Sequence, residues 1–382
     1  MFSSIDHAMM LRAISLAKNG QYTTTPNPNV GCVIAHGDEI VGEGYHYRAG
    51  EPHAEVFALR AAGEKAKGAT AYVTLEPCSH YGRTPPCAEA LVKAGVKRVV
   101  CAMVDPNPKV AGRGIAILQQ AGIDVQTGLL EQDAEALNPG FIKVMKTGLP
   151  YLQLKLAASL DGRTALANGE SKWISGPAAR ADVQRYRAKA GAILSTSATV
   201  LADDPSLNVR WQELGEDVQQ VYPQAALRQP VRVVIDSQNR VTPQHRLVSL
   251  PGTTLLARKQ ADTLVWPQGV EQLVMPDGEG IDLRALMVEL AKHNINHIWV
   301  EAGAGLAGGL LQAGLVDELI LYQAPKLMGS DSRGLVDLNG LVSMAQVPEL
   351  SISDVRMVGG DVRITCRIQQ HIQSDLLNAD KE

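Results

Sequence analysis

The stretch HAEVFALRAAGEKAKGATAYVTLEPCSHYGRTPPC, residues 53–87, decides how this chain is interpreted. It contains one histidine and two cysteines, His53, Cys78 and Cys87, in a segment predicted to fold as helix, strand and helix. A catalytic zinc site takes three protein ligands and leaves one position open for water, whereas a structural zinc site has four protein ligands. One nitrogen and two sulfurs therefore favour a reactive zinc centre.

Glu55, two residues after His53, is the candidate for proton transfer at this centre. A carboxylate close to a zinc-activated water can take its proton and pass it to a departing group. The predicted helices 53–62 and 86–94 both begin at candidate ligands, and the partial positive charge of a helix N-terminus favours thiolate over thiol. His80 is an alternative ligand that could replace one of the cysteines.

Around this stretch the chain alternates between helices and strands. A helix is expected from Ile5 to Lys18, where apolar residues recur at helical spacing, and another over 114–122. Strands are expected at 30–35, 39–46, 70–75 and 97–104. This order predicts an α/β layer with helices on the sheet faces. Residues 138–150 are expected to be the end of a helix and a short linker, so the first domain is predicted to span 1–147.

The rest of the chain also has an α/β pattern and is predicted to form a second domain over 148–370. The segment 211–230 is expected to be a polar surface loop, and 371–382 a polar tail. Strands are predicted at 151–160, 190–195, 232–237, 253–258, 297–302 and 319–325, and helices at 177–188, 282–292 and 305–313.

Composition is typical of a globular protein of two domains, with 382 residues, 45% of them hydrophobic and 20% charged. A net charge of -4 and only 4% aromatic residues argue against nucleic acid as a partner. No apolar run is long enough for a transmembrane helix, so no membrane partner is expected. An odd count of five cysteines without an export signal predicts reduced thiols and a cytoplasmic location.

The pattern H-x-E followed by P-C-x-x-C is the signature of zinc nucleobase deaminases. Here His53, Glu55 and Cys78 match it, and the insert SHYGRTPP separates Cys78 from the second cysteine. With TPNPNVGCVI (25–34) and GEGYHYRAGEPHAE (42–55), this part resembles the deaminase domain of the bifunctional riboflavin-biosynthesis deaminase–reductases. The resemblance implies a three-layer cytidine-deaminase-like domain with Glu55 as proton shuttle. It implies His53, Cys78 and Cys87 as zinc ligands and Asn27 and His46 as substrate contacts.

His80 and Arg83, both in the insert, are candidates to meet a substrate phosphate. The alternative is that they lie in a solvated loop. Cys32, Cys101 and Cys366 lie in apolar, strand-like runs and are expected to be core residues.

Three stretches after the linker together resemble the reductase domain of the same family: 154–176, 199–210 and 300–318. The resemblance implies a dihydrofolate-reductase-like fold and NADPH as hydride donor. The turn GAGLAGG lacks the proline or the serine–threonine pair expected near Ala304 and Gly305. The implied cofactor contacts are Ala157, Trp173, Thr199, Asp203, Ser237, Gly303, Ala304, Gly305, Leu306, Ala307, Gly308 and Gly309. The implied substrate contacts are Ser171, Arg187, Leu207, Arg210 and Glu301.

The resemblance thus implies a two-step enzyme that acts on a phosphoribosylaminopyrimidine, first by zinc-dependent deamination and then by NADPH-dependent reduction of the ribosyl group to ribityl. A homo-oligomer, dimer or tetramer, is expected. One alternative is a nucleoside or RNA deaminase with an appended binding domain, which the low aromatic content, the net charge and the insert oppose. Another is a non-enzymatic binding module stabilised by zinc, in which Glu55 would have no role.

Overall fold

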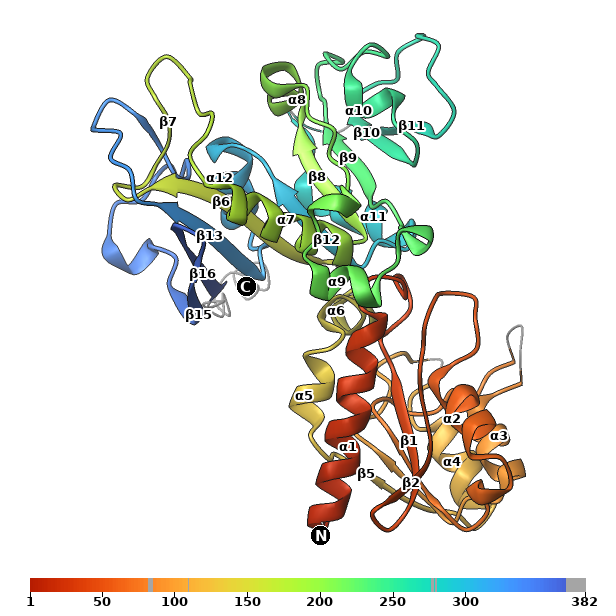
Figure 1. The fold of residues 1–382 in the computed structure, drawn as a ribbon. Coiled ribbons are helices and arrows are strands. Elements are labelled where there is room, and N and C mark those ends of the chain that lie inside the picture. Colours follow the sequence, from red (N-terminus) through yellow and green to blue (C-terminus); the bar gives the residue numbers. More distant parts are fainter. Residues whose placement is uncertain (82–84, 109, 276–277, 279, 369–382) are drawn as a thin grey trace, which may run out of the picture. The chain divides into compact units, whose positions relative to one another are not determined.

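The computed structural model describes residues 1–382 except 82–84, 109, 276–277, 279 and 369–382. The chain forms two compact units, and each is an α/β structure, as the sequence predicts (Figure 1). Unit 1 consists of Met1–Pro150 and Gln219–Arg228, and unit 2 of Tyr151–Val218 and Gln229–Glu382. The predicted tail 371–382 lies outside the described residues.

Unit 1 contains a five-stranded sheet with the order β2-β1-β3-β4-β5. An antiparallel hairpin, β1–β2, forms one side, and β3, β4 and β5 run parallel to one another. The strands are β1 (Gly31–His36), β2 (Glu39–Tyr45), β3 (Thr70–Val73), β4 (Arg98–Cys101) and β5 (Asp124–Thr127).

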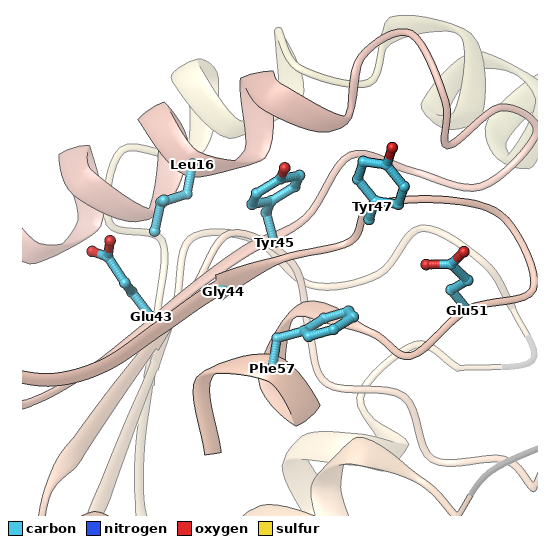
Figure 2. A pocket seen from close by; sticks show the side chains of 7 residues that line it. All are labelled: Leu16, Glu43, Gly44, Tyr45, Tyr47, Glu51 and Phe57. Atoms are coloured by element: carbon cyan, nitrogen blue, oxygen red, sulfur yellow. The ribbon is translucent and has the colours of Figure 1, made fainter. Parts of the chain in front are cut away.

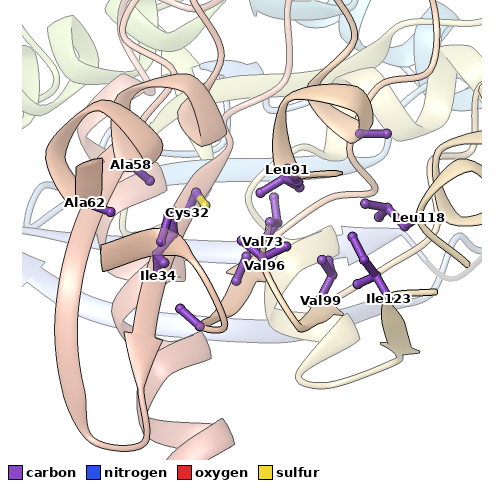
Figure 3. Close-up of a cluster of buried hydrophobic side chains, with 14 of the residues drawn as sticks. Cys32, Ile34, Ala58, Ala62, Val73, Leu91, Val96, Val99, Leu118 and Ile123 are labelled. Carbon is purple, nitrogen blue, oxygen red and sulfur yellow. The ribbon is translucent and has the colours of Figure 1, made fainter. Parts of the chain in front are cut away.

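Helices cover both faces of this sheet because alternate strand residues point to opposite sides. On β1, Cys32 and Ile34 pack in a cluster with residues of α2, α3 and α4, part of which is drawn in Figure 3. Val33 and Ala35 pack in a second cluster with α1, α5 and α6. Unit 1 therefore has three layers. Its helices are α1 (Ser4–Ala17), α2 (Ala54–Ala62), α3 (Cys87–Ala94), α4 (Arg113–Gln120), α5 (Glu131–Glu135) and α6 (Pro139–Thr147).

Unit 2 contains a nine-stranded mixed sheet with the order β11-β10-β9-β8-β12-β6-β13-β16-β15. The strands from β11 to β13 are parallel, and the hairpin β15–β16 adds two antiparallel strands at one edge. The strands are β6 (Tyr151–Ser159), β8 (Ala192–Thr196), β9 (Val231–Ile235), β10 (Thr254–Arg258), β11 (Val270–Val274), β12 (His297–Glu301), β13 (Glu318–Ala324), β15 (Leu350–Val358) and β16 (Asp361–Ile368).

A separate two-stranded sheet in unit 2 pairs β7 (Arg163–Ala165) with β14 (Arg333–Gly334). In the core of the large sheet, Trp299 on β12 and Tyr322 on β13 pack with residues of α7. The helices of unit 2 are α7 (Pro177–Lys189), α8 (Ser197–Asp203), α10 (Arg246–Ser249), α11 (Leu283–Lys292) and α12 (Ala304–Gln312), and α9 (Glu216–Val221) begins in unit 2 and ends in unit 1.

The prediction of a polar surface loop over 211–230 is wrong. This segment contains α9, and its apolar side chains Leu214, Val218 and Tyr222 are buried. Tyr222 stacks on Tyr22, with 5.2 Å between the ring centroids, inside unit 1. Most residues of the segment remain exposed or half-buried, and the few apolar residues spaced among them hold it against the protein.

Other differences are smaller. Residues 139–147 form the complete helix α6 rather than a helix end, with Pro139 at its first position, where proline is favoured. The strand predicted over 97–104 ends at Cys101. The hairpin β15–β16 was not predicted.

All five cysteines carry free thiols, and Cys32, Cys101 and Cys366 are core residues, as expected. Every helix among the described residues is too short or too polar to cross a membrane.

Candidate functional sites

His53, Cys78 and Cys87 meet at one point in unit 1. The Nδ1 atom of His53 lies 3.5 Å from Sγ of Cys78 and 3.3 Å from Sγ of Cys87. One potential ligand atom from each residue lies within 4.8 Å of the others. His53 caps the N-terminus of α2, Cys87 is the first residue of α3, and Cys78 lies in the segment after β3. Both helices therefore begin at this site.

The protonation of the two cysteines indicates that this group fits a cation. Hydrogen bonding with Cys87 lowers the pKa of the Cys78 thiol to about 4. The same bond, together with burial, raises the pKa of Cys87 well above its usual value. A cation bound between two adjacent thiols favours the thiolate form of both, and one nitrogen with two sulfurs is a zinc donor set. The residues present therefore fit zinc.

Glu55 lies in the first turn of α2 and is buried. Burial raises the pKa of its carboxyl group to about 6, although nearby His53 opposes this shift. Its Oε2 atom has no hydrogen-bond partner among the described residues. Because buried polar atoms in proteins are nearly always hydrogen-bonded, this oxygen has the environment expected of a group that contacts water or substrate.

Asn27 and His46 lie beside the metal-binding group. Nδ2 of Asn27 is 3.1 Å from Nε2 of His46, and Nδ1 of His46 is 3.1 Å from the carbonyl oxygen of Pro52. The rings of His46 and His53 meet edge to face, with 5.4 Å between their centroids. His80 is exposed and does not belong to the ligand group, and Arg83 lies outside the described residues.

Glu76, two residues before Cys78, fixes the position of the segment after β3 that carries Cys78. Its buried carboxylate accepts hydrogen bonds from four backbone amides, those of Asp105, Gly112, Gly114 and Ile115. The last two belong to the first turn of α4, whose own cap residue is a glycine without a capping side chain. Glu76 therefore caps α4 from a distant part of the sequence.

A reciprocal pair of hydrogen bonds joins the Asn27 loop to the start of α6. The amide nitrogen of Asn29 donates to Oδ1 of Asn138 at 2.6 Å, and Nδ2 of Asn138 donates to the carbonyl oxygen of Asn29 at 2.9 Å. Nδ2 of Asn29 also donates to the carbonyl oxygen of Leu137. This pair fixes the backbone two residues from Asn27.

A separate pocket of about 440 Å³ lies beside β2, and Figure 2 shows its lining. It contains none of the predicted ligand or substrate residues, so the metal-binding group remains the candidate deaminase centre. Its lining residues are Leu16, Glu43, Gly44, Tyr45, Tyr47, Glu51 and Phe57.

In unit 2, Arg187 on α7 and Glu301 at the end of β12 form a largely buried ion pair. Nε and Nη2 of Arg187 bond the two carboxylate oxygens of Glu301 at 2.6 and 2.8 Å. Burial disfavours the charged carboxylate, but Arg187 outweighs it and lowers the pKa of Glu301 to about 2. Lys155 on β6, paired in register with Glu301, adds a second cation, and burial lowers its pKa.

Three of the predicted cofactor contacts follow neighbouring parallel strands. Thr199 lies on α8 after β8, Ser237 follows β9, and Gly303 caps α12 after β12. Because β9, β8 and β12 are adjacent and parallel, these residues lie at the carboxyl edge of the sheet, where α/β proteins bind ligands.

The glycines at this edge differ in role. A Cβ on Gly303 would meet no atom within 4 Å, so this turn leaves open space for a ligand at the start of α12. A Cβ on Gly308 would lie 1.9 Å from the carbonyl oxygen of Asp337, so Gly308 allows close packing. Ala304, Gly305, Leu306, Ala307 and Gly309 complete the first turns of α12.

The other predicted reductase residues have varied surroundings. Ala157 is half-buried on β6, and Leu207 is buried. Ser171 is exposed. Trp173 is 65% exposed, and the guanidinium of Arg180 lies 4.6 Å from its ring centroid. Exposed Arg210 bonds Glu213 through Nη2 at 2.7 Å, and Lys172 is 3.1 Å from Asp203.

Reasoning from sequence alone did not single out Glu76, Asn138 or Lys155. Glu76 directly precedes the Pro-Cys pair, and Lys155 is a charge in an otherwise apolar strand, so both had a visible signal. Asn138 had no visible signal in the sequence, because its hydrogen-bond partner Asn29 lies 109 residues away.

Both halves of the chain match protein-family models. Residues 3–103 match the cytidine and deoxycytidylate deaminase zinc-binding region, and residues 150–364 match the RibD C-terminal domain. Riboflavin biosynthesis protein RibD of Escherichia coli K12 is 65% identical over 94% of this chain and 98% of its own length. The Haemophilus influenzae protein of the same name is 55% identical over 95% and 98% of the two chains.

Solved structures agree over both halves. Acinetobacter baumannii RibD superposes with a TM-score of 0.87 at 48% identity, covering 96% of this chain and 99% of that one. A second structure superposes with a TM-score of 0.83 at 30% identity and covers 96% of this chain and 99% of its own. It is the diaminohydroxyphosphoribosylaminopyrimidine deaminase/5-amino-6-(5-phosphoribosylamino)uracil reductase of Thermotoga maritima.

Proposed function

This chain belongs to the RibD family, whose members combine a riboflavin-pathway pyrimidine deaminase with a phosphoribosylaminouracil reductase, and we propose which of its residues perform each reaction. The deaminase part has the cytidine-deaminase fold and uses zinc. The reductase part has the dihydrofolate-reductase-like fold and uses NADPH. We assign deamination to residues 1–147 and reduction to 148–370.

In the deaminase, His53, Cys78 and Cys87 hold zinc, which when bound supplies a water that is nucleophilic at neutral pH. Glu55 would hold and move the proton that passes from the attacking water to the amino group of the substrate ring, whose nitrogen would leave as ammonia. The unpartnered, buried Oε2 of Glu55 supports this role. Asn27 and His46, held together by their mutual contact, orient the pyrimidine ring of 2,5-diamino-6-(5-phosphoribosylamino)pyrimidin-4-one.

In the reductase, NADPH supplies the hydride that converts the ribosyl group to ribityl. Thr199, Ser237 and the turn from Gly303 to Gly309 hold the cofactor, with Ala157, Trp173 and Asp203 as further contacts. Backbone amides at the start of α12 suit a phosphate, which the open space at Gly303 supports. Glu301, Arg187, Arg210, Ser171 and Leu207 contact the substrate.

The observation that carries the deaminase assignment is the convergence of one imidazole, two thiols and a buried, unpartnered carboxylate. The test is Glu55→Gln in the full chain, with zinc content, ammonia release and NADPH oxidation measured separately. We expect about one zinc per chain, no ammonia, and normal NADPH oxidation when the deaminated substrate is supplied. Ammonia release at the wild-type rate would overturn the role of Glu55.

We further propose that the protein is a cytoplasmic homo-oligomer. Five free thiols support a reducing compartment. The exposed apolar side chains Ile352, Val355 and Met357 on β15 support self-association.

A further inference from the structure

The turn that follows β9 is held by a carboxylate in the protein interior. Asp236, directly after β9, is completely buried. Its Oδ1 atom accepts a hydrogen bond from the backbone amide of Arg240 at 2.8 Å, and its Oδ2 atom accepts one from the amide of Val241 at 3.1 Å. These two bonds close the segment 236–241 into a compact turn. Ser237, a proposed cofactor contact, is the second residue of that turn.

Arg258, the last residue of β10, fixes this carboxylate. Its side chain is completely buried, and its Nε and Nη2 atoms lie 3.2 and 2.9 Å from Oδ2 of Asp236. Nη2 also donates to the carbonyl oxygen of Val241 at 2.8 Å. One guanidinium group therefore holds both ends of the turn, at Asp236 and at Val241.

The remaining nitrogen of the same guanidinium is bound to another segment of unit 2. Nη1 of Arg258 donates to the carboxylate of Asp262 and, at 2.8 Å, to Oε1 of Gln272. The ring of Trp266 packs on the guanidinium, with 4.9 Å between the guanidinium carbon and the ring centroid. All three nitrogen atoms of this buried cation thus have partners, as a buried charge requires.

The turn is also joined to α8, which carries a second proposed cofactor contact. Nη2 of Arg240 donates to the hydroxyl oxygen of Ser197, the first residue of α8, at 2.9 Å. Thr199 lies two residues further along this helix. The network that begins at Arg258 therefore extends to the segments that carry Ser237 and Thr199.

The order of the strands indicates which half of the cofactor lies here. Glu301, a proposed substrate contact, ends β12, so the nicotinamide half, which transfers the hydride, must lie toward β6 and β12. The turn at Gly303 suits the phosphates in the middle of the cofactor. Because β8 and β9 follow β12 in the sheet on the side away from β6, the adenosine half extends over α8 and the turn after β9 (Figure 1).

We propose that Arg258 is a positioning residue of the reductase: through Asp236, it fixes the turn after β9 in the conformation that binds the adenosine half of NADPH. A loop that becomes ordered only on binding loses affinity to the entropy of ordering, whereas a loop that is held beforehand does not. A buried ion pair usually adds little net stability over apolar residues of the same size, so its role here is the geometry that it imposes. This inference rests on the proposed contacts of Ser237 and Thr199 with the cofactor.

Arg258→Lys in the full chain tests this role. Lysine keeps the charge but has a single nitrogen, so it cannot bind Asp236 and Asp262 together as arginine does. We expect the Kd of adenosine 2′,5′-bisphosphate, measured by calorimetry, to rise about 10-fold, the cost of ordering one or two loop side chains on binding. The matched control is Arg284→Lys, at an exposed arginine on α11, which should leave this Kd unchanged.

A comparison of two hydride donors separates positioning from general damage. Reduced nicotinamide mononucleotide lacks the adenosine half of NADPH, so with this donor Arg258→Lys should reduce the deaminated substrate at the wild-type kcat/KM. With NADPH, kcat/KM should fall about 10-fold through a higher KM, while kcat stays unchanged. An equal loss with both donors would indicate general destabilisation and would overturn the positioning role.

Ser237→Val separates this inference from the proposed cofactor contact. If Ser237→Val binds the adenosine bisphosphate as wild type does, the contact itself is wrong, and the inference fails with it. If Ser237→Val weakens this binding and Arg258→Lys does not, the contact stands and the positioning role is overturned.

Hydrogen exchange of the free wild-type protein needs no variant. The amides of Arg240 and Val241 should be protected without cofactor, because Asp236 already binds both of them. Fast exchange of both amides in the free protein would overturn the preformed turn even if Arg258→Lys failed to fold.

Discussion

The carboxylate of Glu76 accepts a hydrogen bond from the backbone amide of Gly114, with 2.9 Å between Oε1 and the nitrogen. The contact requires a close approach of the segment after β3 to the start of α4, because a Cβ on Gly114 would lie 1.9 Å from the carbonyl oxygen of Pro77. Glu76 and Gly114 thereby clamp the segment that carries Cys78 onto the start of α4. The position of a proposed zinc ligand thus depends on a carboxylate that binds no metal.

Glu76→Gln should weaken zinc binding by about 10- to 100-fold, as loss of a supporting group around a metal site usually does. The amide nitrogen of glutamine would face backbone N–H donors, so at least one bond of the carboxylate would be lost. Competition with a coloured chelator measures the zinc affinity, and NADPH oxidation with deaminated substrate should stay at the wild-type rate. The control is Glu131→Gln, at an exposed position on α5. Unchanged zinc affinity in Glu76→Gln would contradict the supporting role.

Removal of zinc should stop deamination and leave reduction intact, because the proposed ligands all lie in unit 1. Dialysis against a chelator should abolish ammonia release, and added zinc should restore it. The same treatment should make Cys78, which is only partly buried, more reactive toward a thiol reagent. Deamination that survives with no measurable zinc would exclude a metal mechanism.

Asn138→Asp should raise the KM of deamination by roughly 10-fold, since a lost or unfavourable buried hydrogen bond costs about 1–3 kcal/mol. Aspartate would set an anionic oxygen against the carbonyl of Asn29 and so loosen the loop of Asn27. Ammonia release at varied substrate concentration measures the effect, and the reductase step is the internal control for folding. Gln132→Glu adds the same charge at an exposed site on α5 and should have no effect. An equal loss in both reactions would indicate general destabilisation instead.

Glu301→Gln should lower the free energy of unfolding of unit 2 by about 3–5 kcal/mol at pH 7, because it leaves Arg187 buried without its counter-charge. In the folded state the pKa of Glu301 lies at about 2, below its ordinary value of 4.5. The stabilisation by charged Glu301 is therefore complete above about pH 4.5 and is lost as the pH falls toward 2. The difference in the free energy of unfolding between wild type and Glu301→Gln should become smaller as the pH falls over the same range.

Tryptophan fluorescence during urea unfolding suits this measurement, because Trp173, Trp211, Trp266 and Trp299 all lie in unit 2. Glu271→Gln, at an exposed position on β11, is the control and should leave the unfolding free energy unchanged at every pH. A constant difference between wild type and Glu301→Gln from pH 7 to pH 2 would show that the carboxylate charge is not the source of the stabilisation.

Much of the fold was predictable because its signals are local. The helix near 5–18 follows from apolar spacing, and most parallel strands follow from short apolar runs between turn residues. The hairpin β15–β16 could have been found as well, since two alternating runs flank Gly359-Gly360, a common hairpin turn. The structure of the segment 211–230 could not be predicted, because the stacking of Tyr222 on Tyr22 joins residues that are far apart in the sequence.

The sequence by itself determined the chemistry: one imidazole, two thiols and a carboxylate at the spacing of a zinc deaminase, and the family of the whole chain. Only the tertiary structure decided what supports that chemistry, namely the bonds of Glu76 to α4, of Asn29 to Asn138, and of Arg187 to Glu301. The ligand residues lie close together in the sequence, so their spacing can be recognised without the structure. Supporting contacts join residues that are 38, 109 and 114 positions apart, and only folding brings these together.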